Sequence, residues 1–166
     1  MKPQSPTLVR AALALACLLA ALPATAQTVL LVVRERADAR PLPPPLAVRE
    51  GLSGSLFDAG FIVLDAPGSA PVPGPVELAR LARSAGADIV LEVATEYADT
   101  TLGTDLVRIS ARTSYALIDS STSGIVAQGT REATNKDRER EVGRTALGSE
   151  IGRDVAGLVK KALHRL

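Results

Sequence analysis

Three carboxylates lie close together in the sequence, around the polar segment 100–104. Glu96 and Asp99 precede this segment and Asp105 follows it. Oxygen ligands arranged around a loop are what Ca²⁺ binds in proteins. A small-ligand or metal-binding site at this hairpin is therefore one hypothesis for the function. Against it, the spacing matches no known calcium loop, and aspartate at the ends of hairpins is ordinary turn chemistry.

Residues that catalyse reactions are scarce elsewhere in the chain. His164 is the only histidine and is the third residue from the end, and Cys17 is the only cysteine. The usual zinc ligand sets are therefore not available. Ser53, in Gly51-Leu-Ser53-Gly54, comes nearest to a nucleophile elbow, but it falls inside a predicted helix and lacks a base. We expect no enzyme and no cofactor.

Three consecutive strands are predicted between residues 87 and 134. Residues 89–97 and 105–119 alternate between apolar and polar side chains, and a third run covers 125–133. Alternation with a period of two is typical of a strand with one face buried. We expect the three strands to form an antiparallel meander.

The register of the first hairpin follows from burial and charge. Pairing Tyr97 with Val107 keeps the apolar side chains on one face, and a slip by one residue would expose them all. This register sets Glu92 opposite Arg112, an opposite-charge pair that favours it over slips by two.

The second hairpin extends the same row of charges. We expect these pairs directly opposite each other: Leu117–Ala127, Tyr115–Gly129 and Arg112–Glu132. The row Glu92–Arg112–Glu132 that results could be taken for a paired-carboxylate site. We interpret it as a solvated charge ladder, because exposed ion pairs of this kind are common and weak. Its residues and Arg108 form a candidate partner surface.

The other elements surround this meander. A continuous apolar run at 28–33 predicts a strand, and helical spacing predicts helices over 46–59, 75–84 and 142–166, with a short strand at 61–65. The order is strand, helix, strand, helix, three antiparallel strands, helix. We predict an α/β (α+β) two-layer sandwich with a mixed sheet, because helical connections between the first three strands imply parallel crossovers.

The N-terminal segment predicts export. Lys2 and Arg10 precede an apolar run and the small-residue site Ala24-Thr25-Ala26, the pattern of a secretory signal peptide cleaved after Ala26. Residues 27–166 would then form one periplasmic domain without a transmembrane segment. Cys17 follows Leu15-Ala16, as at a lipoprotein cleavage site, but the apolar run continues past it. Lipidation at Cys17 is the less favoured alternative.

The charge balance argues against a nucleic-acid binder. The chain has 19 Lys and Arg and 18 Asp and Glu, and loss of Lys2 and Arg10 with the signal peptide leaves a net charge near zero. Nucleic-acid-binding domains carry a basic excess on one face. Two Phe and two Tyr are the only aromatic residues, so an aromatic-lined ligand pocket is not expected.

Four segments carry a resemblance to a known group of domains: 84–92, 107–112, 116–119 and 123–129. The chain resembles the small periplasmic domains of the TolB N-terminal, CsgG and LpoB kind, in which a helix ends in Gly-Ala-Asp before a strand, and later strands carry Ala-x-Leu-Ile-Asp and Thr-Gly-x-Ile-Val. Ser123 stands where a threonine is usual. The resemblance implies an α/β fold and a non-catalytic envelope protein that binds other proteins during assembly.

Two function classes follow from these observations. The leading hypothesis is an exported, non-catalytic accessory module of the cell envelope that binds a partner protein or a second copy of itself. Its candidate contacts are the polar face with Arg108 and Arg112 and the sheet edge at 125–133. The alternative is a periplasmic domain that binds a small ligand or metal through Glu96, Asp99 and Asp105.

Overall fold

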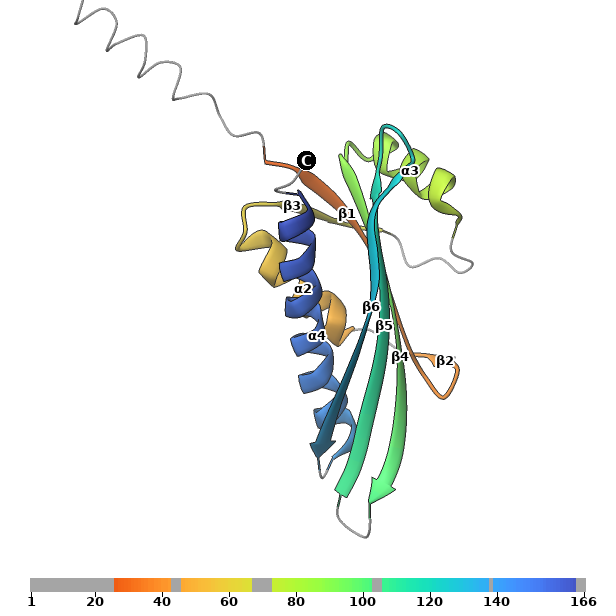
Figure 1. The fold of residues 1–166 in the computed structure, drawn as a ribbon, viewed down its shortest axis with the longest axis vertical. Coiled ribbons are helices and arrows are strands. Elements are labelled where there is room, and N and C mark those ends of the chain that lie inside the picture. Colours follow the sequence, from red (N-terminus) through yellow and green to blue (C-terminus); the bar gives the residue numbers. More distant parts are fainter. Residues whose placement is uncertain (1–25, 43–45, 67–72, 103–105, 138, 164–166) are drawn as a thin grey trace, which may run out of the picture.

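The computed structural model describes residues 26–42, 46–66, 73–102, 106–137 and 139–163 (Figure 1). Residues 1–25 of the expected signal peptide, with Cys17, and the candidate residues Asp105 and His164 lie outside these ranges. The elements in chain order are β1 (Thr28–Ala37), β2 (Arg40–Pro41), α2 (Ala47–Phe57), β3 (Ile62–Asp65), α3 (Pro75–Ser84), β4 (Ile89–Leu102), β5 (Leu106–Asp119), β6 (Ile125–Asp137) and α4 (Arg140–Leu163). The predicted order is confirmed, with the two-residue β2 added.

The strands form one mixed sheet, as predicted, although it has six strands rather than the five expected. β1 runs parallel to β3 and to β4, because α2 and α3 connect these strands as crossovers. β4, β5 and β6 follow as an antiparallel meander. β6 is therefore the last strand on its side, while β3 and β2 both pair with the opposite edge of β1.

The predicted register of the first hairpin is wrong by four residues. Tyr97 pairs with Ala111 rather than Val107, because the strands continue to the Leu102–Leu106 pair. A shift by four keeps every side chain on its predicted face, so burial alone does not distinguish the two registers. The longer ladder satisfies more backbone groups, and the polar segment after Tyr97 belongs to the strand rather than to the turn.

The predicted register of the second hairpin is confirmed. The pairs Leu117–Ala127, Tyr115–Gly129 and Arg112–Glu132 all lie opposite each other. The Tyr115 ring covers Gly129, where an added Cβ would lie 2.7 Å from the tyrosine oxygen. Asp119 fixes the turn by accepting hydrogen bonds from Ser121 and Thr122, and these bonds lower the pKa of its carboxyl to about 2.

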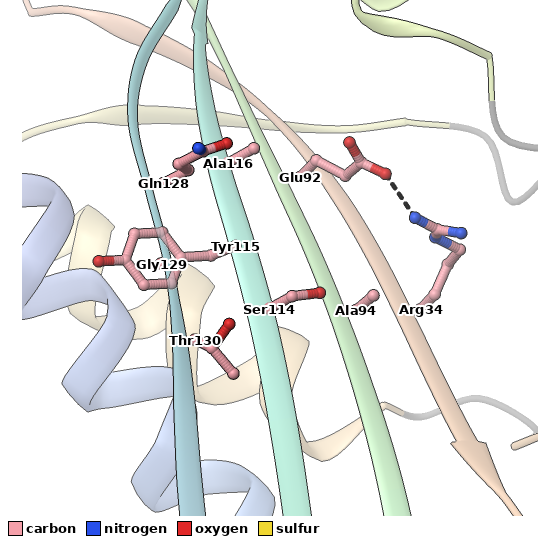
Figure 2. A pocket seen from close by; sticks show the side chains of 9 residues that line it. All are labelled: Arg34, Glu92, Ala94, Ser114, Tyr115, Ala116, Gln128, Gly129 and Thr130. Carbon is pink, nitrogen blue, oxygen red and sulfur yellow. Dashed lines mark hydrogen bonds and ion pairs between the residues drawn. The ribbon is translucent and has the colours of Figure 1, made fainter.

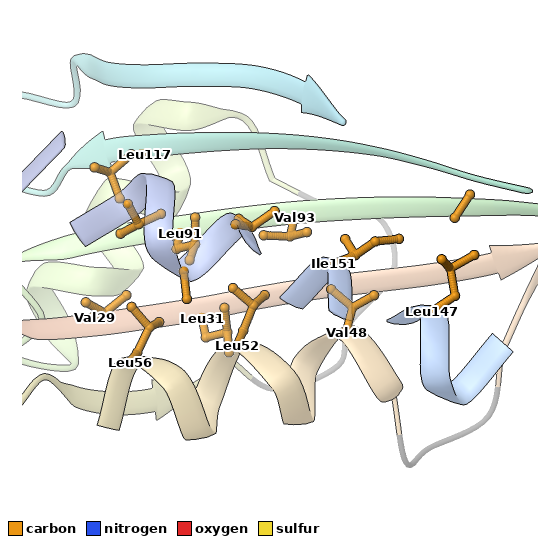
Figure 3. Packing of buried hydrophobic residues seen from close by; sticks show 14 of the residues in the cluster. Val29, Leu31, Val48, Leu52, Leu56, Leu91, Val93, Leu117, Leu147 and Ile151 are labelled. Atoms are coloured by element: carbon orange, nitrogen blue, oxygen red, sulfur yellow. The ribbon is translucent and has the colours of Figure 1, made fainter. Parts of the chain in front are cut away.

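The main core lies between one face of the sheet and the pair α2 and α4 (Figure 3). It is built from aliphatic side chains of the strands and both helices, among them Leu31, Leu91, Leu117, Leu52 and Ile151. α3 lies on the other face at one end of the sheet, where Leu78 and Ala82 cover Leu30, Val90 and Ile118. The molecule is thus the expected two-layer sandwich over most of its length. α3 adds a third layer at one end of the sheet.

The two helices of the main layer touch backbone to backbone. A Cβ added at Gly152 of α4 would lie 2.5 Å from the carbonyl oxygen of Val48 and 2.8 Å from the nitrogen of Leu52, both in α2. Gly51 of α2 faces the backbone of Ser149 in the same way, at 2.5 Å. Glycine at these positions is required by the close approach of the two backbones.

A buried carboxylate joins β1 to α2 and β4. Glu35 is 3 % exposed and accepts hydrogen bonds from the backbone N–H of Val48, at 2.8 Å, and from the hydroxyl of Tyr97, at 3.0 Å. Val48 lies in the first turn of α2, whose N-cap Leu46 makes no side-chain cap, so Glu35 supplies that cap from another element. Burial raises the pKa of Glu35.

Candidate protein-binding surface

Among the described elements, only α3 covers the sheet face opposite α2 and α4, and it does so at one end. On this open face, side chains of four strands stand directly beside one another in rows that follow from the strand register. One row, here called the charged row, is Arg36–Glu96–Arg112–Glu132. The next row toward α3 is Arg34–Ala94–Ser114–Thr130. The sheet therefore presents alternating charges beside a row of mostly small side chains.

The small side chains leave a hollow in the open face, shown in Figure 2. Its volume is about 470 Å³, with Ala94, Ser114 and Ala116 among the residues that line it and Arg34 and Glu92 on one side. A second hollow of about 390 Å³ lies beside it, along the charged row. Both are open to solvent and shallow, so they suit the surface of another macromolecule better than an enclosed small ligand.

The two ion pairs on this face differ in how tightly they are held. Arg34 is paired with Glu92, and the Nε atom of Arg34 is buried without a hydrogen-bond partner in the described structure. Arg112 Nε lies 3.7 Å from Glu132 Oε1, and the two side chains are 73 % and 75 % exposed. Exposed pairs of this length contribute little to stability. Their charges are therefore available to a partner at small cost to the fold.

The predicted site residues lie on this face, but not in the predicted arrangement. Arg112 and Glu132 are adjacent, as expected, and Arg108 lies on the same face opposite Thr100 and Lys136. The prediction that Arg112 lies opposite Glu92 on β4 was wrong. Glu92 lies opposite Ala116 instead, because the first hairpin is longer than predicted.

Two arginines of the open face were missed by sequence reasoning. Arg34 and Arg36 lie in β1, which was expected to end at Val33 because the residues that follow are charged. A signal was present, since Arg34-Glu35-Arg36-Ala37 continues the strand alternation. The alternation is visible only when Glu35 is assigned to the buried face.

The described residues do not assemble the predicted ligand site at the first hairpin. Glu96 points to the open face, whereas Asp99, three residues later, points to the helix side of the sheet. The Asp99 side chain is 4 % exposed and is bound by Arg140, at 3.0 Å, and by Arg144. Two guanidinium groups already satisfy this carboxylate. Among the described residues, no three His, Cys, Asp or Glu side chains come close enough to hold a metal ion.

Glu35 has a perturbed pKa, which in other proteins can mark an active site. Here the carboxylate lies in the core, and its two partners belong to α2 and β4. The Tyr97 hydroxyl faces Gly148 of α4, where a Cβ would lie 2.6 Å away. Because this carboxylate is buried and both of its hydrogen bonds join structural elements, we interpret its role as holding α2, β1 and β4 together.

Comparisons with known proteins show the fold. No family model matches the chain, and no curated protein sequence matches it. Among solved structures, the PelC dodecamer from Paraburkholderia phytofirmans is 20 % identical, with a TM-score of 0.55, over 78 % of this chain and 84 % of that one. Protein XCC0632 from Xanthomonas campestris is 13 % identical, with a TM-score of 0.54, over 87 % and 90 %.

Lipoprotein GNA1162 from Neisseria meningitidis is similar to the chain over nearly the whole length of the lipoprotein. It is 18 % identical, with a TM-score of 0.50, over 83 % of this chain and 99 % of that one. A bacterial lipoprotein therefore shares this fold, which agrees with the predicted group of periplasmic domains. The specific likeness to TolB and CsgG stays a prediction. None of the helices in the described ranges combines the length and apolar composition needed to cross a membrane.

Proposed function

We propose that the chain is an exported, non-catalytic module of the bacterial cell envelope that binds another envelope protein through the open face of its sheet. The observation that carries this proposal is the uncovered charged row with the hollows beside it. The N-terminal signal pattern and the fold shared with bacterial lipoproteins support the location, with cleavage after Ala26 releasing the domain into the periplasm.

The composition of the open face favours protein binding over simple solvation. In the part of the chain that the structure describes, its cations are four arginines and one lysine, namely Arg34, Arg36, Arg108, Arg112 and Lys136. Arginine is enriched in protein interfaces and lysine is depleted, because a planar guanidinium forms paired hydrogen bonds with little loss of entropy. The partner that fits is a protein surface with an opposing pattern of acidic and basic side chains.

Site-specific photocrosslinking in living cells tests the proposal. A photoreactive amino acid replaces Ser114, which lines the hollow, and the matched control places it at Arg153, an exposed position on α4. We expect one envelope protein to be crosslinked through Ser114 and not through Arg153. Arg36→Gln combined with Arg112→Gln should abolish the adduct with little change in the melting temperature, because it removes the cations without bringing like charges directly opposite each other. Identical adducts at both positions, or none at Ser114, would refute the open face as the binding surface.

A further inference from the structure

The outer edge of β6 is a second candidate surface, independent of the open face. No other strand of the described structure pairs with this edge, which runs for 13 residues from Ile125 to Asp137. The opposite edge of the sheet is different, because β3 and β2 pair with parts of β1 there. A long free edge presents unpaired N–H and C=O groups to any strand that can align with it.

The charges along β6 identify the strand that fits. When two antiparallel strands are related by a two-fold axis, the axis preserves the faces of the sheet, so directly opposite residues come from the same face. If the axis passes through Thr134, Glu132 lies opposite Lys136 of the second copy. Arg131 then lies opposite Asp137 of the second copy. Each pair occurs twice, giving four opposite-charge pairs across seven residues of edge.

Other symmetric registers within β6 lack this complementarity. An axis through Arg131, Glu132 or Lys136 places each of these charges against its own copy, which is repulsive. An axis through Thr130, Ala133 or Asn135 brings no two opposite charges of β6 face to face, and an axis through Asp137 places that carboxylate against its own copy. The sequence of β6 therefore selects the register centred on Thr134.

The present partners of these side chains leave them available. Among the described residues, Glu132 makes only the long, exposed contact with Arg112, and Lys136 lies opposite Arg108, a like charge of its own chain. Asp137 accepts a hydrogen bond from the backbone N–H of Glu139 at 3.1 Å, and a carboxylate can accept further donors. A second copy would bring Glu132 to Lys136 and so offset the repulsion from Arg108.

We propose that two copies of the chain join their β6 edges antiparallel around Thr134, so that the two sheets become one. This inference goes beyond the proposed function and does not depend on it, since the dimer would form whether or not the open face binds another protein.

A charge swap tests the pairing. Glu132→Lys and Lys136→Glu each turn two attractive pairs into two repulsive ones, and each should raise the Kd of the dimer by about tenfold or more, measured by analytical ultracentrifugation of the exported protein. The double variant restores both pairs and should restore the dimer. Lys136→Glu also places an acid opposite Arg108 within the chain, so loss of the dimer with this variant would not reflect unfolding. A monomeric wild type, or a larger oligomer insensitive to the swap, overturns the proposal.

A disulfide tests the register. In a Cys17→Ser background, Thr134→Cys places two thiols opposite each other at the axis, where Cα atoms of antiparallel pairs are about 4.5–5.5 Å apart and a disulfide can close. Thr130→Cys, on the same face of β6, is the control, because its two copies would be roughly 26 Å apart. We expect oxidation to crosslink only the Thr134→Cys protein. Failure of that variant to crosslink, or equal crosslinking of Thr130→Cys, overturns the register.

Discussion

The contact between α2 and α4 makes a quantitative prediction that two glycines of the same helix can test. Gly152→Ala would place a methyl group 2.5 Å from the Val48 oxygen and 2.8 Å from the Leu52 nitrogen. Both are backbone atoms of α2, so no side-chain rotation relieves the overlap. At Gly157, further along α4, no heavy atom outside the nearby backbone of its own helix lies within 4 Å of the corresponding position.

Both substitutions gain the higher helix propensity of alanine, but only Gly152→Ala also creates a steric overlap. Alanine favours a helix over glycine by about 1 kcal/mol, and Gly157→Ala should gain most of that. At Gly152 the overlap forces the helices apart, and overpacking of this kind costs about 1–3 kcal/mol or more. Because the whole α2–α4 layer must shift, we expect the upper end of this range and a net loss of about 2 kcal/mol. The variants should then differ by about 3 kcal/mol, or roughly 10 °C in melting temperature.

Urea unfolding followed by circular dichroism measures both free energies, and equal m-values would show that the same surface is exposed on unfolding. The reasoning would be refuted if Gly152→Ala were as stable as Gly157→Ala, because the helices would then not approach as closely as the structure places them. A loss of stability in both variants would instead point to a fault in the assignment of Gly157 to open space.

Two further predictions concern buried carboxylates. Burial raises the pKa of Glu35, so its stabilising contribution is complete below its unfolded value of about 4.3 and is lost as pH rises through the folded pKa. Glu35→Gln should remove that decline from the urea midpoint measured between pH 4 and 8. Arg144→Ala should cost about 2 kcal/mol, because it leaves the buried Asp99 with Arg140 alone. Arg140→Ala should cost under about 1 kcal/mol in the same assay, because the Arg140 side chain is half exposed.

The faces of the sheet were predictable from the sequence because alternation is a local property. Leu91 and Leu117 point to the helix layer in the structure, as their spacing predicted. The register of the second hairpin was predictable as well. The turn after Asp119 begins and ends with strong signals, an aspartate that accepts several local hydrogen bonds and Gly124 at its end. Such a turn leaves little freedom in the length of the loop.

The register of the first hairpin was not predictable on the same grounds. Slips by two or four residues preserve alternation, so the choice falls to loop length and charge. The segment after Tyr97 contains Asp99 and two threonines, residues that are common in turns, yet it continues the strand. What stabilises Asp99 inside the strand is its pairing with arginines of α4, more than 40 residues later in the chain. A contact between residues so far apart in the sequence cannot be detected from the local alternation of apolar and polar residues.

The same dependence on contacts between distant residues explains why only part of the open face was predicted. The β1 arginines belong to the charged row only because β1 lies beside β4, and β1 extends that far because Glu35 turns inward to cap α2. The buried Glu35 and the arginines of the open face thus lie on opposite faces of β1. If two copies join at Thr134, Glu132 at the end of the charged row meets Lys136 of the second copy. The open faces then continue across the joint, and a partner that bridges it would contact both copies at once, which raises its avidity without any new kind of contact.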